Sequence, residues 1–256
     1  MDLQLKGKRS IVLGGTRGIG RAIAETLANE GADVAICARN REQVAETVAD
    51  LSKRGVIASG APIDISNGAE LKSWVEGIAK QFGGIDILIS NASALTMGVH
   101  AEAWESLLKV DILGASNAFE AARPHLEKSA AERGDAAFVM ISSVSAAEAQ
   151  NAQAYGAIKA AMIHYGKGLA RECAKKKIRV NVVSPGTVYF KGGTWNTIEQ
   201  NAPQFFDATI KRNPLGRMGT VQEIANATVF LASPLSSFTT GANLIVDGAI
   251  TSRVNY

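Results

Sequence analysis

The feature that most constrains this chain is a repeated alternation of two hydrophobic patterns. From Arg9 to Asp247, short runs of apolar, mostly β-branched residues alternate with longer stretches in which apolar residues recur every three or four positions. The short runs are typical of buried strands, and the longer stretches are typical of helices with one apolar face. The sequence therefore predicts an α/β fold, with a parallel sheet flanked by helices on both faces.

Seven of the short runs are expected to form the strands of this sheet. No linker or change in composition interrupts the alternation, so residues 1–256 are expected to form a single domain. The first helix is expected to end near Gly31. The predicted strands are residues 10–13, 33–38, 56–61, 85–90, 137–141, 178–183 and 244–246.

Composition excludes several functional classes. The chain has 27 Lys and Arg against 24 Asp and Glu, and a net charge of +3 is too small to indicate a nucleic-acid-binding surface. Cys37 and Cys173 do not make a disulfide framework, and they form no metal-ligand spacing with the three histidines. No apolar run approaches the roughly 18 residues of a membrane span, and charges interrupt the start of the chain. A cytoplasmic protein without metal, membrane or nucleic-acid partners is expected.

A glycine-rich segment links the first predicted strand to the first helix. It reads Leu13-Gly14-Gly15-Thr16-Arg17-Gly18-Ile19-Gly20. Gly14 permits a tight turn, Gly18 lets the backbone approach a pyrophosphate, and Gly20 allows the helix to pack closely on the strand. Glycines that serve only a turn are the alternative. At the start of a βαβ unit, however, this pattern is typical of a dinucleotide-binding Rossmann fold, with Thr16, Arg17 and Ile19 also near the phosphates.

The residues after the second strand indicate which dinucleotide binds. An acidic side chain there would hold a ribose 2′-hydroxyl, whereas an arginine would accept a 2′-phosphate. The segment reads Cys37-Ala38-Arg39-Asn40 and has no carboxylate. Arg39 and Arg17 would surround a phosphate with charge-assisted hydrogen bonds, so NADP(H) is expected in preference to NAD(H). Two solvated surface arginines are the alternative.

Tyr155 and Lys159 lie four residues apart in a stretch of helical period, which places both side chains on one face. A free phenol ionises near pH 10 and is a poor acid or base at neutral pH. An ammonium about 4 Å away would stabilise the phenolate by roughly 4 kcal/mol at an effective dielectric of about 20. Such a pair is common on helix surfaces, so its meaning depends on the neighbouring motifs.

A predicted strand ends in Ser142 and Ser143, at the sheet edge where ligands bind in such folds. With these serines, the whole chain resembles a classical short-chain dehydrogenase/reductase, similar to the 3-oxoacyl-(acyl-carrier-protein) reductases. The motifs that carry the resemblance are the glycine loop, Asn91-Ala92-Ser93, the serines before Tyr155-x-x-x-Lys159, Ser184-Pro185-Gly186, Leu231-Ala232-Ser233 and Val246-Asp247-Gly248.

The resemblance implies an enzyme that interconverts a ketone and a secondary alcohol, with the hydride carried by the cofactor. It makes Tyr155 the proton donor in reduction, Ser143 the hydroxyl that orients the carbonyl, and Lys159 the residue that binds the nicotinamide ribose and acidifies Tyr155. Ser142 remains an alternative to Ser143, because it lies thirteen residues before Tyr155, a usual interval in the family. A homotetramer is also implied.

Further cofactor contacts follow from the resemblance. Adenine is expected against Asp64 and Ile65, the adjacent ribose near Asn91, and the nicotinamide amide on the backbone of Val188. Asn40 is expected beside Arg39 at the adenosine end. For Asp64 and Asn91, the alternative is that they only form turns at strand ends.

Four positions depart from the family pattern. Leu13 replaces a usual threonine, Ser93 replaces a usual glycine, and Phe190 replaces a hydroxyl residue that reaches the nicotinamide amide. Asp111 stands where the family usually has an asparagine that supports a helix irregularity and a water-mediated proton relay. Aspartate accepts hydrogen bonds but lacks the amide donor and adds a charge. We therefore expect an active enzyme with an altered pH dependence.

Residues 187–213 concentrate aromatic side chains in a chain that is only 6% aromatic. The family uses this region as a substrate lid, an element that excludes water when it closes. A bulky apolar, aromatic or acyl substrate is expected. The alternative, of equal weight, is that these aromatics pack against the body of the protein or against another subunit. The aromatic residues are Tyr189, Phe190, Trp195, Phe205 and Phe206, and Leu95, Met97 and Val144 are candidates to line the same cleft.

Two other functions remain open at this point. One is an NAD-dependent alcohol dehydrogenase. The other is a non-catalytic dinucleotide-binding module, which would be expected to lack Tyr155 or Lys159, whereas both are present.

Overall fold

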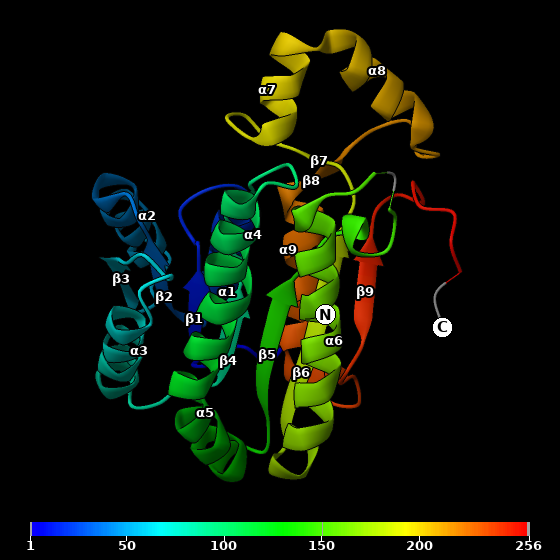
Figure 1. Cartoon of the computed structure of the whole chain (residues 1–256). Helices are drawn as coiled ribbons and strands as arrows, with labels where there is room; N and C mark the ends of the chain where they lie inside the picture. The colour runs from blue at the N-terminus through cyan, green and yellow to red at the C-terminus, as the bar shows by residue number, and fades with distance from the viewer. Residues whose placement is uncertain (1, 150, 255–256) are drawn as a thin grey trace.

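A parallel sheet of seven strands runs through the centre of the molecule (Figure 1). The structure is a computed structural model that describes residues 2–149 and 151–254. The strand order is β3-β2-β1-β4-β5-β6-β9, which confirms the predicted seven-stranded parallel sheet. Its strands are β1 (Arg9–Leu13), β2 (Asp33–Ala38), β3 (Ala58–Pro62), β4 (Ile87–Ser90), β5 (Ala136–Ile141), β6 (Ile178–Pro185) and β9 (Asn243–Val246).

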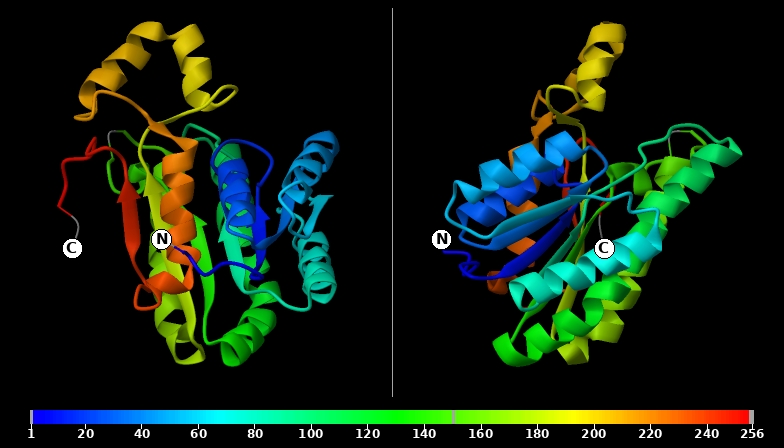
Figure 2. Two further views of the ribbon diagram at one scale, coloured as in Figure 1. Left: turned by 180° about the vertical axis from the view of Figure 1, so that it is seen from behind. Right: turned by 90° about the vertical axis from the view of Figure 1, so that its left-hand side faces the viewer.

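Helices cover both faces of this sheet, as Figure 2 shows in the view turned by 90°. One layer consists of α1 (Gly18–Asn29), α2 (Arg41–Ser52) and α9 (Val221–Ala232). The other consists of α3 (Gly68–Phe82), α5 (Gly114–Arg133) and α6 (Ala154–Cys173). The shorter helix α4 (Ala101–Leu107) packs against α6.

Strand β1 shows why the sequence folds into three layers. Successive side chains of a strand point to opposite faces of the sheet. Ile11 and Leu13 accordingly belong to the core under α3, α5 and α6, whereas Val12 belongs to the core under α1 and α9. Because both faces are covered, every residue of β1 is buried, including the polar Arg9 and Ser10 at its start. The apolar run Ile11–Leu13 is the sequence pattern that fits such a strand.

The strand order reverses at β1, which lies between β2 and β4. The connections that leave β1 and β4 at their carboxyl ends therefore lead to opposite sides of the sheet, and ligands bind in the crevice between such connections. The glycine loop follows β1, and Asn91 follows β4. The fold thus places two of the predicted motifs at this crevice.

The ends of several elements differ from the sequence-based expectation. The third strand covers Ala58–Pro62 rather than 56–61, and the fourth begins at Ile87 rather than at Ile85, whereas helix α1 ends at Asn29, near Gly31 as expected. Strand β3 lies at an edge of the sheet, where Ile57 is exposed and only one neighbouring strand supplies hydrogen bonds. Hydrophobic periodicity alone predicts the ends of a strand poorly, because those ends depend on hydrogen bonds to the neighbouring strand.

Two further helices stand above the carboxyl edge of the sheet (Figure 1). They are α7 (Thr194–Asn201) and α8 (Pro203–Arg212), joined to the body through a short parallel pair that the sequence did not indicate, β7 (Val188–Tyr189) and β8 (Gly219–Thr220). In α7 and α8, Thr209 is the one buried residue. This segment therefore has little core of its own.

Internal contacts hold the α7–α8 segment together. The Tyr189 hydroxyl donates a hydrogen bond of 2.5 Å to Glu199 Oε2, and the carboxylate beside it raises the pKa of Tyr189. The rings of Tyr189 and Phe206 meet edge to face, with their centres 5.9 Å apart.

None of the described helices is long and apolar enough to cross a membrane.

Candidate active site

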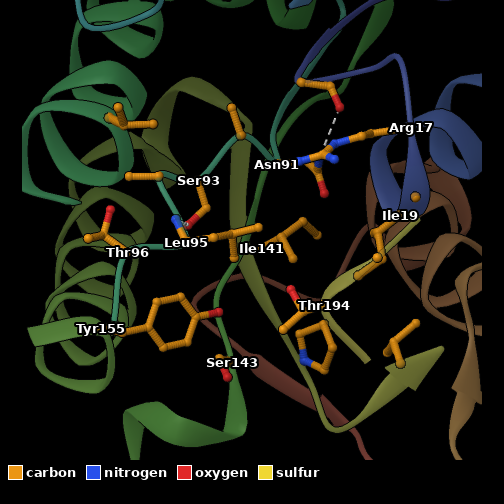
Figure 3. Close-up of a pocket in the computed structure, with 18 of the residues that line it drawn as sticks. Arg17, Ile19, Asn91, Ser93, Leu95, Thr96, Ile141, Ser143, Tyr155 and Thr194 are labelled. Carbon is orange, nitrogen blue, oxygen red and sulfur yellow. Dashed lines mark hydrogen bonds between the residues drawn. The ribbon is translucent and has the colours of Figure 1, made fainter. Parts of the chain in front are cut away.

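A cleft of about 1340 Å³ follows the carboxyl edge of the sheet from the glycine loop to α6 and the α7–α8 segment. Clefts that hold one drug-sized ligand usually measure roughly 300–1,000 Å³, so this one has room for a dinucleotide and a second molecule. Figure 3 shows the part of the cleft into which Tyr155 and Ser143 point.

The glycine loop has the shape that a pyrophosphate requires. Gly14 and Gly18 both have left-handed backbone angles, with φ of 76° and 55°. A β carbon on Gly20 would collide with the Gly14 carbonyl oxygen, so the close contact between loop and helix depends on glycine. Helix α1 begins at Gly18 without a side-chain cap and without an acidic residue in its first turn. Its N–H groups are therefore free to bind an anion, and the loop fits the phosphates of a dinucleotide.

Polar side chains brace this end of the cleft. Asn91 Nδ2 donates a hydrogen bond of 3.0 Å to the Gly14 carbonyl oxygen, which ties the loop after β4 to the loop after β1. Asp64 Oδ1 accepts hydrogen bonds from the backbone and hydroxyl of Ser66, and these bonds lower the pKa of Asp64. Both residues thus form turns or braces, as the alternative interpretation expected, while Asn91, Asp64 and Ile65 all line the cleft.

The two arginines predicted to bind phosphate line the same end of the cleft. Arg17 and Arg39 are exposed, and neither has an ion-pair partner within residues 2–149 and 151–254. Asn40 also lines the cleft and caps helix α2, because its Oδ1 accepts the Gln43 N–H at 2.8 Å. Thr16 lies across from the same helix, 3.4 Å from Gln43.

Helix α6 presents Tyr155 and Lys159 to the opposite end of the cleft. Tyr155 lies in the first helical turn and Lys159 one turn later, and both line the cleft as their spacing predicts. Lys159 is only 2% exposed, and its Nζ lies 5.6 Å from the centre of the Tyr155 ring. The ammonium donates a hydrogen bond of 3.0 Å to the Ile141 carbonyl at the end of β5. It is therefore held between the sheet and the phenol.

Asp111 forms an ion pair with Lys159 that the sequence analysis did not foresee. It lies in a π-helical turn, Leu108–Leu113, and is fully buried. Its Oδ1 lies 3.0 Å from Lys159 Nζ, and its Oδ2 accepts the Ala94 N–H at 2.9 Å. Oδ1 accepts no directed hydrogen bond among the residues that the structure describes, so the contact with the ammonium is electrostatic. A buried ammonium needs such a counter-charge, and the carboxylate supplies it.

The two candidate serines have different surroundings. Ser142 is buried, and its hydroxyl donates a hydrogen bond of 2.9 Å to the Lys159 carbonyl oxygen. Ser143 is half-buried, lies beside Tyr155 in Figure 3, and accepts the Ser145 N–H at 3.1 Å. Among residues 2–149 and 151–254, the Ser143 hydroxyl donates no hydrogen bond, so its proton is available to a ligand, whereas the proton of Ser142 is already used. The geometry favours Ser143 as the residue that meets a carbonyl.

Phe190 makes a contact with the glycine loop that its sequence position did not indicate. Its ring lies against Gly18, so closely that a β carbon on Gly18 would come within 2.6 Å of Cζ. The same ring covers Gly193 at the start of α7. Val188, which is predicted to contact the nicotinamide amide, lines the cleft two residues earlier in β7. The α7–α8 segment thus contacts the phosphate end of the cleft through an aromatic ring.

A Rossmann-type sheet with a phosphate-binding loop at one end of a cleft and serine, tyrosine and lysine at the other is the architecture of a dinucleotide-dependent oxidoreductase. Comparison with known proteins defines the family. Residues 14–251 match a family model described as enoyl-(acyl carrier protein) reductase.

Curated relatives match over almost the whole chain. An isoepoxydon dehydrogenase of Penicillium expansum is 37% identical over 251 residues, which is 96% of this chain and 95% of that protein. The 3-oxoacyl-[acyl-carrier-protein] reductase of Escherichia coli is 34% identical over 253 residues, covering 97% of this chain and 99% of the relative.

Solved structures share the fold as well. A short-chain dehydrogenase from Burkholderia cenocepacia, crystallised with NADP, superposes with a TM-score of 0.85 at 30% identity, covering 96% of this chain and 99% of that one. Similar structures include NADPH complexes and an NADH-dependent reductase. The chain belongs to the short-chain dehydrogenase/reductase family and is an oxidoreductase that acts on carbonyl or alcohol groups.

Single substitutions distinguish which of the two serines is catalytic. Ser143→Ala removes the free hydroxyl and should lower kcat by about a hundredfold to a thousandfold, the effect of losing one donor to a reacting oxygen, without weakening cofactor binding. Ser142→Ala should keep turnover but lower the melting temperature, because a buried hydrogen bond worth about 1 kcal/mol is lost. Turnover assays and thermal melts check both variants. The reverse pattern would assign the catalytic hydroxyl to Ser142.

Asp111→Asn tests the ion pair. The substitution removes a negative charge 3.0 Å from the Lys159 ammonium, so the positive field at Tyr155 increases and the phenolate is favoured. The rise of alcohol oxidation with pH should therefore move to lower pH. Profiles of kcat/KM against pH measure the shift, with Asp50→Asn on the distant helix α2 as the charge-matched control. Identical profiles for wild type and Asp111→Asn at every pH would contradict the ion pair's role.

Proposed function

We propose that this protein is an NADP(H)-dependent enzyme that interconverts a ketone and a secondary alcohol, with Tyr155 as the acid and base. The observation that carries the proposal is the single cleft that joins the glycine loop to Ser143, Tyr155 and Lys159. A dinucleotide held by the loop would extend along this cleft toward α6, and the reacting carbonyl would then lie beside Tyr155 and Ser143.

Each side chain has a distinct part in this reaction. The bound nicotinamide supplies the hydride in reduction and accepts it in oxidation. Tyr155 donates its hydroxyl proton to the carbonyl oxygen during reduction and takes it back during oxidation. Ser143 donates a hydrogen bond to the same oxygen, and Lys159 holds the nicotinamide ribose while its charge favours the phenolate. Asp111 positions Lys159.

The preference for NADP(H) rests on Arg17 and Arg39. Both guanidinium groups line the adenosine end of the cleft, where the 2′-phosphate of the cofactor would lie. The segment after β2 supplies no carboxylate that would repel this phosphate or bind a free 2′-hydroxyl. Asp64, which also lines this end, is hydrogen-bonded to Ser66, and the charge of Arg39 contributes to the lowered pKa of its carboxyl group. The charge of this end of the cleft therefore favours the phosphorylated dinucleotide.

Apolar side chains line the substrate end of the cleft, which favours a bulky apolar or aromatic ketone or an acyl chain. Leu95 and Met97 are exposed there without packing into a core. From the α7–α8 segment, Trp195 and Phe205 contribute stacked rings with centres 6.0 Å apart. We propose that residues 187–213 act as a lid that closes these rings over the substrate and excludes water.

We further propose a cytoplasmic homotetramer. Two separate surfaces carry exposed apolar side chains. One lies on and beside α4, and the other lies along α9 and β9. A tetramer with three two-fold axes needs two different interfaces of this kind. The exposed residues of the first surface are Trp104, Leu108 and Leu113, and those of the second are Phe230, Leu235, Phe238 and Leu244.

A screen of ketones and the matching alcohols with both cofactors tests the function. We expect NADPH-dependent reduction of aromatic or long-chain ketones and much weaker activity with small sugars, because the substrate end is apolar. Preferred turnover of alcohols with NAD would support the NAD-dependent dehydrogenase instead. Cofactor binding without any turnover would support a non-catalytic module.

Arg39→Ala tests the cofactor preference. Loss of one charge-assisted hydrogen bond, roughly 1.5–3 kcal/mol, should weaken NADPH binding about tenfold to a hundredfold and leave NADH binding unchanged. Nicotinamide fluorescence titrations measure both affinities. Arg41→Ala is the matched control, because Arg41 is a neighbouring arginine that does not line the cleft. Tighter binding of NADH than of NADPH by the wild type would reverse the assignment.

A further inference from the structure

Leu95 has an unusual backbone conformation for a leucine. Its φ of 53° lies in the left-handed region, which costs a residue with a side chain roughly 1–2 kcal/mol. Within the described part of the chain, four non-glycine residues have a positive φ, and of these only Leu95 lines the cleft. Strain of this kind persists where neighbouring contacts impose it, often at a functional site.

Two acceptors hold the loop in this conformation. Ser93 Oγ accepts the Leu95 N–H at 3.2 Å, and Asp111 Oδ2 accepts the preceding N–H, that of Ala94, at 2.9 Å. A glycine at 93, the usual residue of the family, would have no side-chain acceptor. The loop cannot turn away from the cleft without losing both bonds, one of them to a buried carboxylate. The backbone of Leu95 is therefore fixed from two sides.

This conformation directs the Leu95 side chain into the cleft near Tyr155 (Figure 3). The side chain is 46% exposed. Ala94, the residue before it, packs on the same small apolar cluster as Tyr155. Packing into a core does not explain why a leucine occupies a strained position here. Contact with a ligand beside the phenol does explain it.

We propose that Leu95 determines which ketones reach Tyr155. The fixed backbone sets the direction in which the Leu95 side chain leaves the chain. In whichever rotamer it adopts, the side chain takes up room in the cleft, so the group on one side of the carbonyl must fit next to it. The group on the other side has room toward Met97 and the rings of the α7–α8 segment. Leu95 thus admits ketones with one small and one bulky substituent and excludes ketones with two bulky substituents. This selection rests on the proposed function.

Acetophenone, which has a methyl group beside its carbonyl, and benzophenone, which has two phenyl groups, test the proposal. With NADPH, wild type should prefer acetophenone. Leu95→Ala should raise the ratio of kcat/KM for benzophenone to that for acetophenone at least tenfold, since packed apolar sites discriminate about 10–200-fold for a single methylene. NADPH affinity should remain at the wild-type level. Ser93→Ala, which removes one acceptor, should shift the ratio in the same direction by a smaller factor.

Val99→Ala is the matched control, because Val99 is an exposed apolar residue of the same loop that does not line the cleft. It should leave the ratio unchanged. A Leu95→Ala enzyme that binds NADPH normally and keeps the wild-type ratio would overturn the proposal while leaving the proposed function intact. A wild-type protein that binds NADPH but reduces no ketone would contradict the proposed function and the selection together.

Discussion

The charge of Lys159 is the constraint on which the active site depends. An ammonium that is almost completely withdrawn from water is tolerated only where neighbouring groups replace its hydration. Three elements meet at this charge: β5 through the Ile141 carbonyl, the π-helical turn through Asp111, and α6 through Lys159 itself. Removal of either polar partner would leave buried charge uncompensated, so the position of the ammonium beside Tyr155 follows from the electrostatics of the interior.

The layers of the fold place this chemistry at the carboxyl edge of the sheet. Both faces of the sheet are buried under helices, whereas the cleft opens at the carboxyl edge. There the loops after β1, β4 and β5 and the start of α6 converge. Asn91 ties two of these loops together through the Gly14 carbonyl. The glycine loop and the phenol of Tyr155 therefore line one continuous cleft.

Much of this arrangement was predictable from the sequence, because it depends on local patterns. Hydrophobic periodicity identified the seven strands, and the positions of Gly14, Gly18 and Gly20 predicted a tight turn between a strand and a helix, which the structure shows between β1 and α1. The spacing of Tyr155 and Lys159 correctly placed both on one helix that lines the cleft. In each case the pattern of apolar, glycine or catalytic residues is complete within a few residues of sequence.

The parts that were not predicted depend on contacts between distant segments. The ion pair of Asp111 and Lys159 joins residues far apart in the chain, although a carboxylate in place of a neutral amide was the signal that could have suggested it. Neither the contact of the Phe190 ring with Gly18 nor the left-handed backbone of Leu95 produces a repeating pattern in the sequence. The boundaries of the edge strand β3 likewise depend on pairing with β2 rather than on its own residues.

The most direct measurement is the turnover of Tyr155→Phe, together with its affinity for NADPH. The substitution removes one oxygen and keeps the ring that packs against the small cluster around Leu107 and Ile158. If only proton transfer is lost, NADPH binding should stay close to that of wild type. The rate of ketone reduction should fall by about a hundredfold to ten-thousandfold. Ketone reduction at the wild-type rate by the phenylalanine variant would contradict the account.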